Sequence, residues 1–105
     1  MTDLVIVLTT AADQQADELA RTLVDERLAA CVNVHAAMTS TYRWNGRAVT
    51  EPERQLVIKT RRSRLPDLER RLNELHSYEL PELIVLSPES ASDAYASWIS
   101  QETTP

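Results

Sequence analysis

Hydrophobic and polar positions follow two different periods along this chain, and the switches between them mark the expected strands and helices. Short apolar or alternating runs rich in β-branched residues predict strands. They occur at residues 4–8, 31–35, 39–44, 55–59 and 83–86. The runs at residues 4–8, 56–58 and 83–86 are apolar at every position. We therefore expect those three strands to be buried on both faces.

Apolar residues spaced three and four apart predict helices between these strands. The first helix runs from about Ala11 to Leu28, with Thr10 as its N-cap. The second begins after residues 63–64, with Pro66 in its first turn. A last short helix is expected to start at Ser90.

The dipeptide Asn45-Gly46 predicts a tight turn. Both central positions of a type I′ turn need a positive φ, which asparagine and glycine tolerate better than other residues. We therefore expect a two-residue hairpin, with a bend at residues 36–37 before it. Pro52 lies on the return strand and cannot donate a ladder hydrogen bond, so it should occupy an edge or a bulge.

The expected order of elements is βαββαβ followed by a terminal helix. This is the ferredoxin-like pattern of α+β proteins, built on an antiparallel sheet. Right-handed crossovers would place both long helices on one face of that sheet. No repeat or linker interrupts the chain, so residues 1–105 are expected to form a single domain.

One face of the expected sheet has no cover, which argues for an oligomer. Each Val, Ile or Leu side chain is worth roughly 1.5–3 kcal/mol when fully buried, and soluble monomers rarely expose a large apolar patch. The hairpin from Thr39 to Trp44 extends beyond the neighbouring strands, and a lone hairpin is marginal in water. We expect it to pair with another subunit, with Trp44 as an anchor; the alternative is that Trp44 packs on its own subunit.

The composition restricts the partners and location of the protein. Its formal net charge is −5. Nucleic acids and anionic membranes attract basic surfaces, so neither is expected as a partner. No apolar run approaches the roughly 20 residues needed to span a bilayer. A single cysteine excludes an intramolecular disulfide, and a reducing cytoplasm is the expected location.

Soft metal ligands are scarce: besides two methionines they are Cys31, His35 and His76. Thiolate and imidazole suit copper or zinc, but the spacing does not resemble a structural zinc site. Cys31 and His35 would lie roughly 13 Å apart on one strand, so they cannot share a metal unless the strand bends. His76 comes from another element and could approach either residue or a symmetry mate. The alternative for Cys31 is a small buried core residue.

The link from His76 to Glu82 gathers ionisable groups and a phenol where a helix gives way to a strand. Pro81 fixes its own φ and biases Leu80 toward extended geometry, so the link should be ordered. Ordered polar links at the ends of elements often carry sites. The alternative is a simple helix stop, with His76 favoured there by the helix dipole.

A larger set of residues could line a cleft between subunits. It comprises Tyr42, Trp44, Lys59, Tyr78, Glu79 and Glu82. Two explanations are open: a pocket for a small ligand, or interface packing that contains an ion pair between Lys59 and Glu79.

No pattern typical of an enzyme is present. The only glycine belongs to the predicted turn, which excludes a glycine-rich phosphate loop. No set of nucleophile and base follows from residue spacing, and two histidines leave few candidates for a general base. We therefore expect a non-enzymatic protein without an organic cofactor.

Four motifs in this order resemble the CutA divalent-cation tolerance family. They are Ala30-Cys31-Val32-Asn33, Tyr42-Arg43-Trp44-Asn45-Gly46, Ile58-Lys59-Thr60 and the link from His76 to Glu82. The resemblance extends from Val5 to Ile99. One departure is Ser77, which stands where the family usually has a proline and should loosen the link that carries His76.

This resemblance implies a homotrimer of PII-like architecture with the sheets facing inward. It also implies a role in tolerance of copper or other divalent cations, with Cys31 and His76 as the metal ligands. Two ligands per subunit indicate a weak, exchangeable metal. The alternative is a PII-like sensor or scaffold, since the related PII signalling proteins bind small molecules between subunits.

Overall fold

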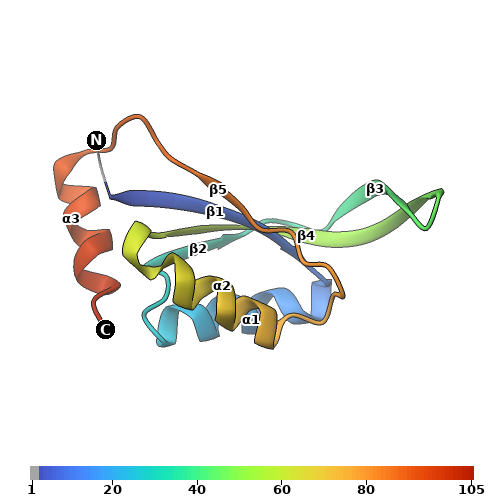
Figure 1. The fold of residues 1–105 in the computed structure, drawn as a ribbon, viewed down its shortest axis with the longest axis horizontal. Helices are drawn as coiled ribbons and strands as arrows, with labels where there is room; N and C mark the ends of the chain where they lie inside the picture. The colour runs from blue at the N-terminus through green and yellow to red at the C-terminus, as the bar shows by residue number, and fades with distance from the viewer. Residues whose placement is uncertain (1–2) are drawn as a thin grey trace.

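The computed structural model describes residues 3–105, which form one antiparallel sheet and three α-helices (Figure 1). The strands are β1 (Leu4–Ala11), β2 (Cys31–Val34), β3 (Met38–Trp44), β4 (Arg47–Arg61) and β5 (Ile84–Leu86). The helices are α1 (Asp13–Asp25), α2 (Leu65–Leu75) and α3 (Asp93–Glu102), and a 3-10 turn (Arg62–Arg64) leads into α2. No described helix is long and apolar enough to cross a bilayer.

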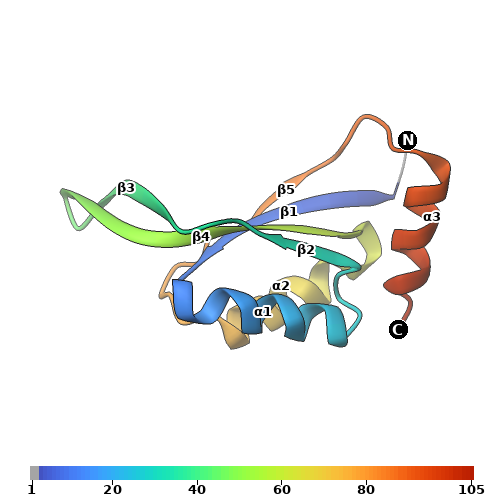
Figure 2. The ribbon, with the colours of Figure 1, turned by 180° about the vertical axis from the view of Figure 1, so that it is seen from behind.

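The strand order is β2-β4-β1-β5, with β3 paired to the far half of β4. Every described pair of strands is antiparallel. Helices α1 and α2 cover the same face of the sheet, and α3 lies across the end where β1 begins (Figures 1 and 2). The predicted α+β, ferredoxin-like fold is therefore confirmed.

The core lies between the sheet and the two long helices. Alternate strand residues point toward the helices, and Val7, Leu56 and Ile58 are fully buried there. Their partners on the helices are spaced three and four residues apart, which turns one stripe of each helix inward. These partners are Ala16, Leu19, Leu23, Leu68 and Leu72.

The opposite face of the sheet carries an apolar patch, and neither long helix covers it. Strand register places Leu8 beside Val57 and Ile84 on this open face. Ile84 and Leu86 remain 47% and 46% exposed in the single chain. The uncovered apolar face expected from the sequence is therefore present.

The hairpin of β3 and β4 projects from the sheet, and the molecule is 44 Å long in this direction (Figure 1). Asn45 and Gly46 have φ values of 52° and 77°, which confirms the tight turn predicted from these two residues. β4 is continuous from the hairpin into the centre of the sheet. Pro52 lies in the part of β4 that pairs with β3 alone, so the other edge is free there. This fits the predicted edge position of a residue without an N–H.

The predicted start and end of the first helix are wrong. Thr10 does not cap α1: β1 pairs with β4 as far as Ala11, so Thr10 belongs to the sheet and the cap position falls to Ala12. The helix ends at Asp25 because Arg27 adopts a left-handed φ of 60°. The N–H of Leu28 then donates to the carbonyl of Leu23 over 3.0 Å, a Schellman closure with arginine in the usual glycine position.

The last helix also begins later than predicted. Ser92, not Ser90, is its N-cap, and the Ser92 hydroxyl accepts a hydrogen bond from the backbone N–H of Tyr95 over 3.2 Å. Serine is a favoured N-cap residue at either position, so residue type alone does not separate the two caps.

Candidate functional site

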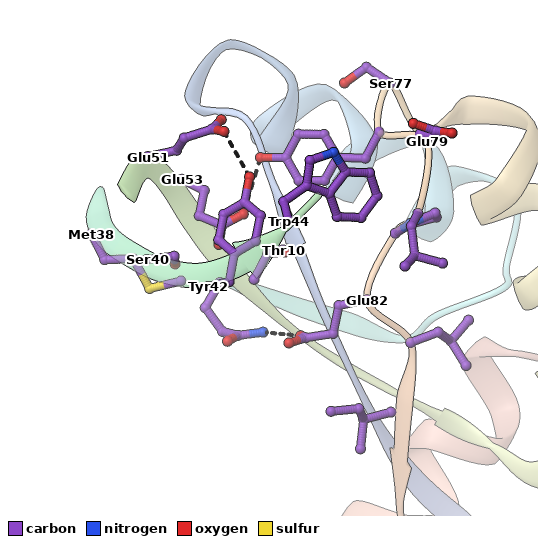
Figure 3. A pocket seen from close by; sticks show the side chains of 16 residues that line it. Thr10, Met38, Ser40, Tyr42, Trp44, Glu51, Glu53, Ser77, Glu79 and Glu82 are labelled. Carbon is purple, nitrogen blue, oxygen red and sulfur yellow. Dashed lines mark hydrogen bonds between the residues drawn. The ribbon is translucent and has the colours of Figure 1, made fainter. Parts of the chain in front are cut away.

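A pocket of about 800 Å³ opens between the β3–β4 hairpin and the link that joins α2 to β5 (Figure 3). It lies on the open-face side of the sheet, with Thr10 and Gln55 of the central strands in its lining. The hairpin supplies one wall and the link supplies the other. The lining residues are Thr10, Met38, Ser40, Tyr42, Trp44, Glu51, Glu53, Gln55 and residues 77–84.

Hairpin register brings the polar and aromatic side chains of one wall together. Ser40 lies opposite Glu51, and Met38 lies opposite Glu53. Antiparallel partners share a face, and alternate residues along a strand return to it. Tyr42 therefore projects on the same side as both glutamates. Its hydroxyl donates a 2.7 Å hydrogen bond to Glu51 Oε1.

The second wall repeats this phenol–carboxylate contact. The hydroxyl of Tyr78 donates to Glu53 Oε1 over 3.1 Å. Glu82 accepts a 3.0 Å hydrogen bond from Gln55 Nε2, so the link is tied to β4 at two points. Glu79 makes no hydrogen bond or ion pair with any residue that the structure describes.

Both phenols are held in the protonated, donating form. Burial raises the pKa of Tyr78 to about 12, with a further contribution from its hydrogen bond to Glu53. The hydrogen bond to Glu51 raises the pKa of Tyr42, because the phenol must give up this bond to ionise; burial and the charge of Glu51 act in the same direction. At neutral pH the carboxylates therefore stay paired with neutral hydrogen-bond donors.

His76 ends α2 and anchors the link to the sheet. Its Nε2 lies 2.6 Å from the carbonyl oxygen of Thr10, which can only accept, so Nε2 carries the proton. Its Nδ1 accepts the backbone N–H of Tyr78 over 3.1 Å. The imidazole is therefore the neutral Nε2–H tautomer, and both of its nitrogens are occupied. A metal could bind His76 only by displacing one of these contacts.

Ser77 ties the link down instead of loosening it. Its hydroxyl donates to Gln15 Oε1 over 3.0 Å, and its backbone N–H lies 3.4 Å from the same oxygen. The amide of Gln15 in turn donates to the carbonyl oxygen of Leu75 over 2.8 Å. A proline at position 77 could make neither contact, so Ser77 gives the link two contacts that a proline would lack.

The structure separates the two predicted metal ligands within one chain. Cys31 pairs with Lys59 on the open face, whereas His76 contacts Thr10, which pairs with Gln55. Four residues along β4 correspond to about 13 Å. Among residues 3–105, no three His, Cys, Asp or Glu side chains lie close enough to hold one metal ion.

Five of the six predicted cleft residues lie in the pocket, and one does not. Tyr42, Trp44, Tyr78, Glu79 and Glu82 all line the pocket, which lies within one chain; the predicted cleft between subunits stays a prediction. Lys59 does not, because strand register places it level with Leu86 at the other end of the sheet. Within the described chain it forms no ion pair with Glu79. Cys31 is half-buried on the open face and is not part of the core between sheet and helices.

Sequence reasoning missed the two glutamates that hold the phenols, Glu51 and Glu53. A signal for them was present. A two-residue turn at Asn45-Gly46 fixes the register of the whole hairpin, and counting outward from it pairs Ser40 with Glu51 and Met38 with Glu53. The contact between the hairpin and Tyr78 could not be counted in this way, since it depends on tertiary folding.

The raised pKa of Tyr78 predicts a loss of stability at high pH. The folded state holds this proton more tightly than the unfolded state, so the stabilisation is complete below pH 10 and is lost as the pH rises toward about 12. Denaturant titrations across this range, with phenolate absorbance as the readout of ionisation, should show a smaller decline for Tyr78→Phe than for the wild type. Tyr95→Phe should follow the wild type, because the Tyr95 phenol has no hydrogen-bond partner among the described residues. An equal decline in all three proteins would contradict the assignment.

Comparison with known proteins gives one consistent family. A family model described as CutA1 divalent ion tolerance protein matches residues 4–102. The divalent-cation tolerance protein CutA of Thermus thermophilus is 37% identical over 99 residues, covering 94% of this chain and 96% of that protein. The chloroplastic protein CutA of Arabidopsis thaliana is 38% identical, and this chain spans only 55% of its length.

A solved structure has the same fold. The protein described as PII-like protein CutA from Nostoc matches with a TM-score of 0.91 and 33% sequence identity. The match covers 95% of this chain and 97% of the Nostoc chain. The two chains therefore share one fold over nearly their whole length.

Proposed function

Because the chain belongs to the CutA1 divalent ion tolerance family, we propose that it is a non-enzymatic cation-binding protein that acts in the tolerance of, or response to, divalent metal ions such as copper. One observation supports the binding of cations in general, although it does not select a metal ion. The charged side chains lining the pocket are all carboxylates: Glu51, Glu53, Glu79 and Glu82. A pocket of this charge favours positively charged ligands. The proposed location is the cytoplasm.

The proposed metal is copper or a similar divalent cation, bound weakly by Cys31 and His76. The separation of these residues in one chain means that each would contribute to a site completed by a neighbouring subunit. Cys31 is suited to this arrangement because it lies on the open face of the sheet. His76 would have to give up its contact with either the Thr10 carbonyl or the Tyr78 N–H, which costs binding energy and supports an exchangeable metal.

Metal affinity should fall by about tenfold or more in both Cys31→Ala and His76→Ala. Removing a residue that only supports a metal ligand already lowers metal affinity roughly 10–100-fold, and these variants remove the ligands themselves. The measurement is calorimetric titration of chelator-stripped protein with copper and zinc, with and without oxygen, and with magnesium as the metal control. His35→Ala is the matched control, since it removes the other histidine of the chain. Binding that survives unchanged in Cys31→Ala and His76→Ala would contradict this metal site.

The proposed assembly is a homotrimer with the open faces turned inward. Two observations support an oligomer: the exposure of Ile84 and Leu86, and the hairpin that projects beyond the sheet. Burying side chains of this size would stabilise an interface by roughly 1.5–3 kcal/mol each. The fold alone does not select the number of subunits; the trimer follows from the family resemblance.

The second candidate function is a PII-like sensor or scaffold for a small molecule. The pocket favours it specifically, because about 800 Å³ is the volume of a small-molecule site and far exceeds the space of a metal ion. A ligand that binds the folded state raises its melting temperature. A shift that persists in chelator would support this function, and a shift that requires metal would support the metal-binding function.

A further inference from the structure

We propose that the pocket between the β3–β4 hairpin and the link binds an organic ammonium ion. This inference rests on the second candidate function and names the chemical class of its ligand. Two independent features of the pocket carry it, the aromatic rings of its walls and the sign of its charges.

The aromatic rings come from both walls of the pocket. Tyr42 and Trp44 lie on the hairpin (Figure 3). Tyr78 lies on the link. Tyr42 and Trp44 are 40% and 39% exposed in the single chain, so no other part of that chain covers their rings fully. A cation over the face of such a ring is attracted by the ring quadrupole, most strongly for tryptophan. Rings on opposite walls can act on one ligand together.

The charges of the pocket have one sign. No Lys, Arg or His is among the described residues that line it. His76 lies behind Tyr78, with ring centroids 4.7 Å apart, and it is neutral in the tautomer set by its hydrogen bonds. Arg54, the neighbour of Glu53 in sequence, points to the other face of the strand, where it approaches Asp13 and Asp17. The four pocket carboxylates are therefore not neutralised by a basic side chain.

The arrangement suits a large cation better than a metal ion. The pocket carboxylates do not converge into a group of three that could hold a metal. Glu51 and Glu53 are each engaged by a phenol, and Glu82 is engaged by Gln55. Glu79 is the carboxylate without a partner among the described residues. An ammonium group with a carbon skeleton can contact rings and dispersed carboxylates at once, whereas a bare divalent ion requires close oxygen ligands.

The test is calorimetric titration in the presence of chelator, with choline and putrescine as probes. Each has an uncharged counterpart of similar size: the choline analogue with carbon in place of nitrogen, and butanediol. The expected result is binding about tenfold or more tighter for each ammonium compound than for its counterpart, as desolvated cation–π contacts predict. Equal binding of charged and uncharged partners would overturn the ammonium assignment and leave the small-molecule function intact.

Two variants test whether the ammonium compounds bind in the pocket, and a third controls for nonspecific attraction to the negative charge of the protein. Trp44→Ala and Glu51→Gln should each weaken the ammonium compounds, while Glu69→Gln removes one exposed carboxylate from α2 and should leave affinity unchanged. Glutamine has the shape of glutamate, so Glu51→Gln remains informative even if Trp44→Ala alters the assembly of the protein. Sedimentation velocity measures whether Trp44→Ala keeps the assembly of the wild type. Equal weakening by Glu69→Gln would show nonspecific attraction and overturn the proposal.

The same assay separates failure of this inference from failure of the function on which it rests. Nucleotides and small carboxylates are titrated beside the ammonium probes. If these anions bind and the ammonium compounds do not, the pocket is a small-molecule site of another class and the proposal is wrong. If none of the molecules binds, both the ammonium assignment and the small-molecule function are overturned, while the metal titration of Cys31→Ala and His76→Ala stands independently.

Discussion

Replacing Leu86 with glutamate is expected to dissociate the protein into monomers. Leu86 is 46% exposed in the single chain and lies on the open face beside Ile6. If that face is buried between subunits, each subunit would bring an unpaired carboxylate into an apolar interface, at a cost of several kcal/mol per ion. This cost to the interface is larger than the contribution of the Leu86 side chain to the stability of one subunit.

Light scattering coupled to gel filtration measures this outcome directly. Val24→Glu is the matched control, because Val24 is 38% exposed and lies on α1, away from the open face. The control should keep the mass of the wild type. An oligomer that survives Leu86→Glu, or a wild type that is already monomeric, would contradict the assembly proposed here.

Leu72→Ala should destabilise the protein by about 2–5 kcal/mol, the usual range for removing a leucine from a packed core. Leu72 is 1% exposed and belongs to the core cluster between α2 and the sheet. Its replacement removes apolar burial and leaves a cavity, and both effects act in the same direction. This would be a large share of the total stability of a small domain, which is typically about 5–15 kcal/mol.

Denaturant unfolding at one fixed protein concentration measures the change, because dissociation and unfolding are coupled in an oligomer. Leu80→Ala makes the same chemical change at a side chain that is 72% exposed, and its effect should stay within about 0.5 kcal/mol. Similar losses in the two variants would mean that the assigned core does not dominate the stability of the subunit.

The sequence predicts the fold well because its local signals agree with the tertiary structure. The apolar run beginning at Leu4, the turn at Asn45-Gly46 and the proline in the first turn of α2 each have a local cause. The errors occur where a long-range contact overrides such a signal. Thr10 is a good cap residue, yet pairing with Gln55 keeps it in β1.

The candidate site is predicted less completely, for a related reason. Five of the six proposed cleft residues line the pocket because the hairpin and the link each carry a recognisable cluster. Lys59 shares β4 with Glu51 and Glu53, but strand rise places it at the far end of the sheet, away from the pocket. The two glutamates flank Pro52, and only the alternation of β4 continued across this proline predicts that they share a face. The occupied nitrogens of His76 depend on three-dimensional contacts that no spacing rule provides.

The position of β1 in the middle of the sheet has a consequence for the synthesis of the protein. β1 leaves the ribosome before the other described elements, and both of its partners, β4 and β5, are encoded much later in the chain. Its apolar residues must remain unpaired until residues 54–61 have emerged, and pairings over such separations form slowly. During that interval the nascent chain exposes an aggregation-prone strand. Translation speed and chaperone access before residue 61 will therefore govern the yield of folded protein.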